Sequence, residues 1–179
     1  LYFHTITDSS AEGDGDAVGV ASAPAPSGPW TYHDELLLAP DPEGWDSYAL
    51  WAPSVVRTEA GYFMYYSGLG PPPRWDRAIG LATSTDGFTW KRHGDPVLAA
   101  SETNGAWDSK RIEQSVVTTS PDGLVMVYRA DRGSGSFSGI RTAFGFATST
   151  DGVVWQRGQA EPVLQPDDEA AWNALWSAG

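Results

Sequence analysis

GlyLeuAlaThrSerThrAspGly at residues 80–87 and GlyPheAlaThrSerThrAspGly at residues 145–152 are two copies of one phrase, and each leads within three residues to a tryptophan. A weaker copy, GlyValAlaSer at 19–22, leads to Gly28-Pro29-Trp30. The copies lie about 60 to 65 residues apart, which is too long for a helical hairpin repeat and suits a unit of several strands. The sequence therefore predicts tandem multi-stranded repeats.

Two runs inside the repeats have the character of fully covered strands. GlyTyrPheMetTyrTyrSerGly at 61–68 and LeuValMetValTyrArgAla at 124–130 are rich in strand-forming residues and apolar on both alternating faces. Strands of this kind occur where each sheet lies between two others, as in radially stacked blades. The 20 Gly and 13 Pro residues and turn pairs such as Asp86-Gly87 argue against helices. The predicted fold is all-β, a β-propeller with blades of four antiparallel strands.

The two best copies predict four strands each, at 52–57, 62–67, 79–84 and 90–93, and at 115–119, 125–129, 142–148 and 155–157. We expect one partial propeller domain over residues 1–179, with an incomplete blade at 1–40, full blades at 41–100 and 101–166, and the start of a further blade or a closing strand at 167–179. This is about three blades' worth, whereas propellers close with roughly 4–8. Either further blades outside this sequence or self-association of two copies would complete the ring.

Composition excludes several classes of partner. The net charge of −12, with only 11 Lys and Arg, predicts no binding to nucleic acid or to anionic membranes. The absence of cysteine removes disulfide scaffolds and thiol nucleophiles but leaves the compartment undetermined. No apolar run approaches membrane-spanning length. The chain opens on Leu1 rather than methionine and is expected to be a piece of a longer protein, so any targeting signal would lie outside it and the localisation stays unknown.

A family resemblance is carried by LeuTrpAlaProSerValVal at 50–56, followed by GlyTyrPheMetTyrTyrSer, IleGlyLeuAlaThrSer and AspGlyPheThrTrp. This series resembles a blade of the five-bladed furanosidase-type glycoside hydrolases, chiefly family 43 and its relatives in family 32. Ser27-Gly28-Pro29-Trp30 is similar to a turn that ends a blade in family 43. SerThrAspGly at 84–87 also resembles the sialidase Asp box, but its glycine comes one residue too early.

The resemblance implies a carbohydrate partner and hydrolysis of arabinose- or xylose-containing polysaccharide, or of fructan, by carboxylate acid and base. It also implies a secreted or periplasmic bacterial protein. We predict no cofactor, although some relatives hold a calcium ion on the propeller axis. The histidines stand at unrelated repeat positions, so no metal site is predicted.

Candidate carboxylates are sought on the inner strands, because such enzymes place an acid and a base in a central pocket. Asp46 and Asp108 occur in TrpAspSer phrases of both units, and repetition predicts a structural role. Asp86 and Asp151 lie in blade-ending turns, where their side chains can bond backbone amides, and are also predicted to be structural.

Glu113 is the predicted catalytic residue. In ArgIleGluGlnSerValVal we match it to Ala52 of the preceding unit, so blade packing does not explain it. A carboxyl in a pocket can act as a proton donor, whereas the alternative is a solvated glutamate or a partner for Arg111 or Arg129. By resemblance, family 32 has a glutamate here as general acid, and family 43 has an aspartate that tunes the acid. Both roles stay open.

Five further residues are predicted to bind substrate. Trp51 offers an aromatic surface for a sugar ring, although core packing is the alternative. Ser54 stands where family 43 often has aspartate, and Arg129 requires a carboxylate partner if it is buried. Asp131 would line the pocket or form a surface pair with Arg132, the second being preferred, and Arg111 completes the set. The cations otherwise look too dispersed for the basic triad of a sialidase-like enzyme.

Two departures from the family pattern support a rival hypothesis. The first-blade aspartate expected to act as base or nucleophile would precede Leu1, and the fourth-blade glutamate that serves as acid in family 43 has no counterpart. The alternative is therefore a catalytically inert propeller fragment with a carbohydrate-binding or structural role.

Overall fold

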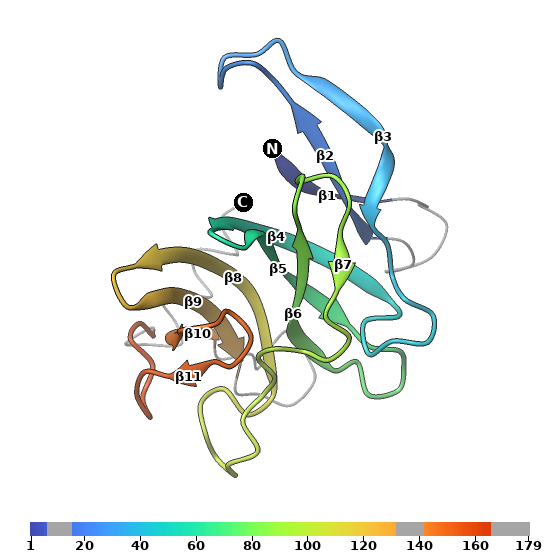
Figure 1. Cartoon of the computed structure of the whole chain (residues 1–179). Coiled ribbons are helices and arrows are strands. Elements are labelled where there is room, and N and C mark those ends of the chain that lie inside the picture. Colours follow the sequence, from blue (N-terminus) through green and yellow to red (C-terminus); the bar gives the residue numbers. More distant parts are fainter. Residues whose placement is uncertain (7–15, 132–141, 166–179) are drawn as a thin grey trace, which may run out of the picture.

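The computed structural model describes residues 1–6, 16–131 and 142–165, which form three antiparallel sheets and contain no helix (Figure 1). The first sheet consists of β1 (Tyr2–Ile6), β2 (Asp16–Ser22) and β3 (Thr31–Leu38). The second consists of β4 (Ala49–Thr58), β5 (Gly61–Leu69), β6 (Arg77–Ser84) and β7 (Lys91–Arg92). The third consists of β8 (Arg111–Ser120), β9 (Gly123–Asp131), β10 (Thr142–Ser149) and β11 (Gln156–Arg157). The prediction of an all-β chain with four-stranded antiparallel units is confirmed. The expected strand at 167–179 lies outside the described residues.

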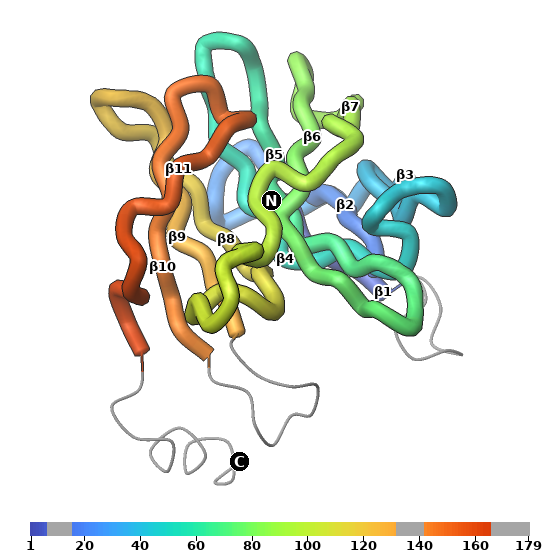
Figure 2. The backbone as a smooth tube through the Cα atoms, turned by 90° about the horizontal axis from the view of Figure 1, so that it is seen from below, coloured from blue at the N-terminus to red at the C-terminus, as the bar shows by residue number. Residues whose placement is uncertain are grey.

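The sheets fan out with the second between the other two (Figure 2). Its strand β5 is covered on both faces, as its apolar sequence predicted. Met64 and Tyr66 pack with Val18 in a core shared with the first sheet. Tyr65 packs with Trp155 in a core shared with the third sheet. Within the described residues, no helix could span a membrane.

The repeated glycine has the same structural position in every sheet, opposite an aromatic residue of the neighbouring strand. The pairs are Gly19 with Phe3, Gly80 with Tyr66, and Gly145 with Tyr128. A Cβ atom added at Gly80 would lie 2.4 Å from Cζ of Tyr66, and steric repulsion forbids that distance. Close ring packing therefore explains the first residue of the repeated phrase.

The repeated aspartate of TrpAspSer holds the ends of a blade together. Asp46 is fully buried, accepts a 2.8 Å hydrogen bond from the hydroxyl of Tyr66, and forms an ion pair with Arg92 of β7. Burial raises the pKa of the Asp46 carboxyl, outweighing the opposing effects of Arg92 and Tyr66. Trp45 stacks on Tyr66, with ring centroids 6.2 Å apart. The third sheet repeats the arrangement with Trp107, Asp108, Tyr128 and Arg157.

The blade-ending turns are built by Asp86 and Asp151. Oδ1 of Asp86 accepts hydrogen bonds from the backbone N–H groups of Phe88 and Thr89, at 2.8 and 2.7 Å. These donors hold the pKa of the Asp86 carboxyl well below its usual range, and backbone donors lower the pKa of Asp151 in the same way. Both aspartates therefore have the structural geometry predicted for them.

Each of these turns also receives a tyrosine from the preceding sheet. The hydroxyl of Tyr2 donates to the carbonyl of Gly87 at 3.0 Å. The hydroxyl of Tyr65 donates to the carbonyl of Gly152 at 2.8 Å. Because Tyr2 and Tyr65 occupy matching register positions, opposite Val20 and Leu81, the two joints between sheets are built alike.

Candidate functional site

Both inner strands, β4 and β8, contain a bulge near their first residues. The pairing of β4 with β5 shifts between Trp51 and Ser54, and that of β8 with β9 shifts between Glu113 and Ser115. The residues with left-handed backbone there are Ala52, with φ of 50°, and Gln114, with φ of 51°. The structure therefore matches Ala52 to Gln114, which places Glu113 at the position of Trp51.

The prediction that Glu113 replaces Ala52 is therefore wrong by one residue. It rested on the shared SerValVal phrase at 54–56 and 115–117, but five residues separate Val117 from the hairpin Gly123, whereas four separate Val56 from Gly61. Register confirms the shift, since Trp51 lies opposite Ser67 and Glu113 lies opposite Arg129. A one-residue slip moves a side chain to the other face of a strand, so the correction changes what Glu113 contacts.

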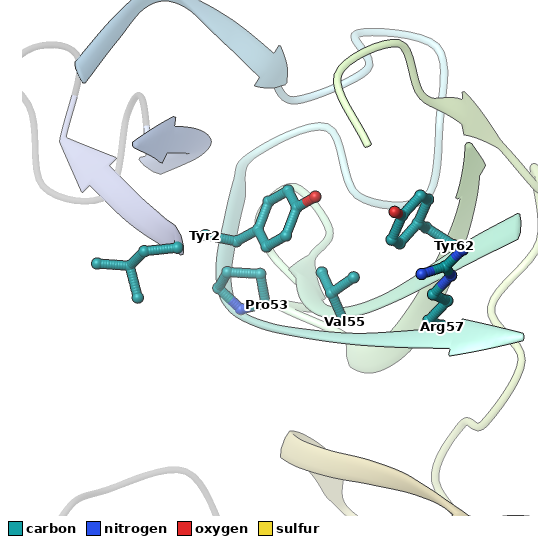
Figure 3. A pocket seen from close by; sticks show the side chains of 6 residues that line it. Tyr2, Pro53, Val55, Arg57 and Tyr62 are labelled. Carbon is teal, nitrogen blue, oxygen red and sulfur yellow. The ribbon is translucent and has the colours of Figure 1, made fainter. Parts of the chain in front are cut away.

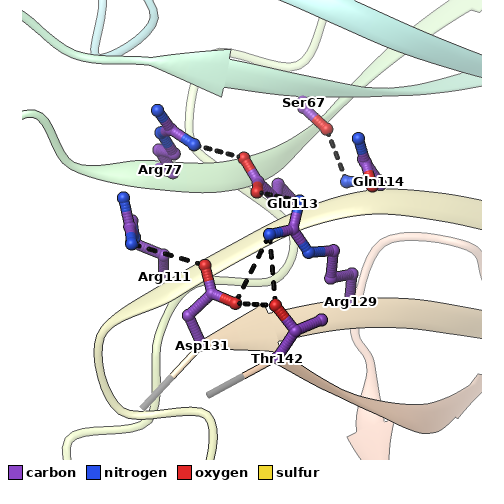
Figure 4. Close-up of polar contacts among 8 residues, drawn as sticks. All are labelled: Ser67, Arg77, Arg111, Glu113, Gln114, Arg129, Asp131 and Thr142. Carbon is purple, nitrogen blue, oxygen red and sulfur yellow. Dashed lines mark hydrogen bonds and ion pairs between the residues drawn. The ribbon is translucent and has the colours of Figure 1, made fainter. Parts of the chain in front are cut away.

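The start of β8 and its neighbouring strand ends carry a charged cluster (Figure 4). At matching register positions, the third sheet differs from the second at every place in this cluster. The third sheet has Arg111, Glu113, Arg129, Asp131 and Thr142, where the second has Ala49, Trp51, Ser67, Leu69 and Arg77. The second sheet shows that a blade forms with mostly uncharged residues at these places, so blade architecture does not require the charges.

Glu113 is 3% exposed, and guanidinium groups occupy both of its oxygens. Nη1 of Arg77 donates to Oε2 at 2.6 Å, and Nη1 of Arg129 lies 2.7 Å from Oε1. Arg129 comes from the same sheet, whereas Arg77 comes from β6 of the second sheet. These contacts compensate the desolvation of the buried carboxylate. The expected pairing of Arg129 with a carboxylate is thus observed.

Asp131 is 1% exposed, which makes the preferred prediction of a surface pair wrong. It is the last residue of β9, which lies between β8 and β10 in the sheet. Its Oδ1 accepts a 2.9 Å hydrogen bond from Thr142, and it forms longer ion pairs with Arg129 at 3.6 Å and Arg111 at 3.5 Å. The expected partner Arg132 lies outside the described residues.

Arg77 is the charged residue of the cluster that sequence reasoning missed. Its guanidinium carbon lies 5.4 Å from the ring centre of Trp51, a cation–π distance, while it also pairs with Glu113. Arg77 thus contacts two matching positions on neighbouring sheets. No repeated phrase contains it, and only the register that places it opposite Leu69 would have pointed to it.

Ser54 lies apart from this cluster. Its Oγ accepts a 3.0 Å hydrogen bond from the backbone N–H of Val117, which ties β4 to β8. Ser67 does the same for the backbone N–H of Gln114, at 2.7 Å. The structure therefore brings together Trp51, Arg111, Glu113, Arg129 and Asp131 among the predicted site residues, and leaves Ser54 at a joint between sheets.

The expectation that cations are too dispersed to form a group is wrong. Arg77, Arg111 and Arg129 converge, but on the chain's own carboxylates Glu113 and Asp131. Sequence separation concealed this because two blades contribute to the group. The described residues contain no cluster of three or more His, Cys, Asp or Glu that could hold a metal ion.

A separate open pocket of about 440 Å³ lies between β1 and β4 (Figure 3). It is lined by Leu1, Tyr2, Pro53, Val55, Arg57 and Tyr62. None of these residues takes part in the charged cluster. The cation in the lining, Arg57, has its guanidinium carbon 5.9 Å from the ring centre of Tyr62. Because this pocket has no carboxylate in its lining, the charged cluster is the stronger candidate for chemistry.

No protein-family model matches the chain. Over 94 residues it is 35% identical to the probable arabinan endo-1,5-alpha-L-arabinosidase C of Aspergillus niger, and the match covers 49% of this chain and 28% of that protein. Over 92 residues it is 35% identical to the arabinan endo-1,5-alpha-L-arabinosidase A of Aspergillus niger, with the same shares covered. The chain thus matches less than a third of the length of these curated relatives.

Solved structures show the same architecture. A family 117 glycoside hydrolase from Zobellia galactanivorans matches with a TM-score of 0.74 and 16% identity, covering 89% of this chain and 46% of that one. A family 32 beta-fructofuranosidase of Bombyx mori matches with a TM-score of 0.70 and 18% identity, covering 94% and 33%. A thermostable family-43 glycoside hydrolase matches with a TM-score of 0.61 and 18% identity, covering 94% and 56%.

The chain has the fold of a partial glycoside hydrolase propeller. The predicted propeller is thereby confirmed, and the three sheets are blades of it. The charged cluster lies where the inner strands of the second and third blades meet, since β4 and β8 supply Trp51 and Glu113. The solved structures establish the architecture of the chain.

Proposed function

We propose that this propeller forms part of the substrate pocket of a glycoside hydrolase that acts on arabinose-containing polysaccharide by carboxylate acid and base hydrolysis. The choice of arabinose is supported by the 35% identity to the arabinan endo-1,5-alpha-L-arabinosidases of Aspergillus niger. Carbohydrate is accordingly the proposed partner. The proposed localisation is extracellular or periplasmic, where such polysaccharide would be met.

One observation carries the proposal: where the second blade has a mostly uncharged end, the third blade has buried carboxylates and arginines. Where the second blade has Trp51 and Leu69, the third has Glu113 and Asp131, each at most 3% exposed. Removing a charged group from water costs several kcal/mol of desolvation free energy per ion. A pair of hydrophobic residues would pack at these positions without that cost. Charged groups retained against such a cost often mark functional sites.

The geometry favours one of the two roles that the family resemblance left open for Glu113. Both oxygens of its carboxylate form ion pairs with guanidinium groups, so in this arrangement neither oxygen presents a proton to a leaving group. Glu113 is then a positioning residue that fixes the charge around the reacting bond through Arg77 and Arg129. Trp51, whose ring contacts Arg77, would supply an aromatic surface for the sugar.

The test is a hydrolysis screen of the purified chain against linear arabinan, nitrophenyl arabinofuranoside, nitrophenyl xyloside and fructan. We expect turnover on the arabinose substrates. Glu113→Gln removes the charge with little change in shape. Because misplacement of the groups that Glu113 positions can cost about 100-fold, we expect kcat to fall by about that factor, with a shifted pH profile. Glu59→Gln, on an exposed turn at the other end of β4, is the matched control and should leave kcat unchanged.

Full activity of Glu113→Gln beside an active parent protein would overturn the role of Glu113. Binding of arabino-oligosaccharide without turnover would overturn the hydrolase proposal and establish the inert carbohydrate-binding alternative. The mass in solution, measured on the same preparation, shows which species is active. Hydrolysis by a dimer would show that a second copy completes the ring.

A further inference from the structure

The charged cluster has two layers of opposite sign. The carboxylates of Glu113 and Asp131 are 3% and 1% exposed, whereas the side chains of Arg77, Arg111 and Arg129 are 26%, 19% and 24% exposed. The acids therefore lie beneath the guanidinium groups. A ligand that reaches this end of the inner strands meets cations first.

The described residues of the cluster also carry a surplus of positive charge. Three arginines face two carboxylates, which leaves a net charge of one positive unit in a chain whose total is −12. Arginine presents a planar fork of N–H donors that matches the oxygens of a carboxylate. The surplus charge is thus suited to one oxyanion from outside the chain.

Among the contacts between described residues, Arg111 is the least tightly engaged arginine of the cluster. Arg77 and Arg129 approach Glu113 to 2.6 and 2.7 Å, whereas Arg111 reaches Asp131 only at 3.5 Å. Among the described residues, the buried Nη2 atom of Arg111 makes no hydrogen bond, and neither does the buried Oδ2 of Asp131, so an outside ligand would meet the exposed remainder of the guanidinium group. The second blade has Ala49 at the matching position, so blade packing does not require an arginine there.

We infer that Arg111 binds an oxyanion carried by the substrate, and that this oxyanion is the carboxylate of a uronic acid in the polysaccharide. The inference rests on the proposed function, because that proposal supplies the carbohydrate. It adds that the chain recognises an acidic sugar. The net charge of −12 repels a polyanion, so the preferred ligand is a mostly neutral chain with isolated uronate residues.

The experiment measures binding by calorimetry to glucuronosyl-xylose and to its methyl ester. The ester removes the negative charge and preserves the sugar. We expect the acid to bind about tenfold more tightly than the ester, since a charged partner strengthens the hydrogen bonds of a guanidinium. The difference should shrink as salt is added, because the cluster is partly exposed.

Variants then assign the preference to one residue. Arg111→Gln should abolish the preference for the acid, and Arg111→Lys should keep part of it because the charge remains without the fork. Arg57→Gln makes the same change at an exposed arginine outside the cluster and should keep the full preference. Thermal melting checks each variant, and if Arg111→Gln does not fold, the reduced preference of Arg111→Lys is the deciding measurement.

Equal affinity for acid and ester, or an undiminished preference in Arg111→Gln, would overturn the inference. Glucose 6-sulfate forms a further arm, and tighter binding of the sulfate without any preference for the uronate would overturn the assignment to a carboxylate. Arabinotriose separates the two proposals. Its hydrolysis without acid preference would overturn only this inference, whereas acid preference without action on arabinotriose would overturn only the choice of arabinose.

Discussion

Asp108 is a buried charge whose two partners come from separate strands of its own blade. It accepts a 3.2 Å hydrogen bond from the Tyr128 hydroxyl of β9, and Nε of Arg157 of β11 lies 2.6 Å away. The carboxylate is 3% exposed and the arginine 33% exposed. Removing the carboxylate charge would leave the guanidinium without a counter-charge, and water at its exposed third would compensate only in part.

We therefore predict that Asp108→Asn lowers the free energy of unfolding by about 2 kcal/mol. Urea unfolding followed by tryptophan fluorescence measures the loss. Asp76→Asn is the control, because Asp76 pairs with Arg74 at the surface, where the side chains are 63% and 81% exposed. That change should cost less than about 0.5 kcal/mol. Equal losses in the two variants would show that burial does not govern these ion pairs.

At the scale of elements, the SerThrAspGly turns give the blades a pH dependence. The pKa values of Asp86 and Asp151 lie below their ordinary value near 3.8 in the folded chain, since backbone N–H groups donate to the ionised carboxylates. A carboxyl with a depressed pKa in the folded state contributes stability that is present above its unfolded pKa. That contribution is lost as the pH falls through the folded pKa.

The double variant Asp86→Asn and Asp151→Asn tests this. We expect the melting temperature of the parent protein to fall between about pH 4 and pH 2, and that of the variant to fall less, because asparagine keeps the acceptor oxygen without titrating. At pH 7 the variant should be the less stable protein. Melting curves across this range decide the matter, and parallel profiles for the two proteins would contradict the assigned role of the turns.

At the scale of the whole molecule, the blades are joined by polar contacts as well as by their cores. The second and third blades share the hydrogen bond from Tyr65 to Gly152 and the ion pair from Arg77 to Glu113. The first and second blades are joined by an equivalent hydrogen bond, from the hydroxyl of Tyr2 to the carbonyl of Gly87. Among the described residues, the ion pair between Arg77 and Glu113 has no counterpart at that joint.

Tyr65→Phe should loosen the joint between the second and third blades. The carbonyl of Gly152 is left without its buried donor, so we predict a loss of about 1–3 kcal/mol in the free energy of unfolding. Tyr62→Phe, three residues earlier on β5, makes the same chemical change on a ring at the open pocket and should cost less than about 0.5 kcal/mol. Chemical unfolding of both variants provides the measurement. A loss in Tyr62→Phe as large as that in Tyr65→Phe would refute a special role for the joint.

The sequence by itself determined the fold class, the strands of the two full units and the structural aspartates. These depend on local properties: a repeat period, the alternation of apolar residues along a strand, and turn residues that bond their own backbone. Glu113 was found as a candidate because it departs from its sister unit, but its matching position was one residue off. The SerValVal phrase did not reveal where the bulge falls.

Only the tertiary structure decided what the candidate residues contact. Arg77 meets Glu113 across a separation of 36 residues, and Asp131 is buried rather than paired at the surface. The physical reason is that a bulge sets which face each inner-strand side chain occupies, and the packing of adjacent blades sets which faces meet. Composition and residue spacing do not specify the position of a bulge or the packing between blades. The convergence of three arginines on two buried carboxylates is therefore seen only in the assembled blades.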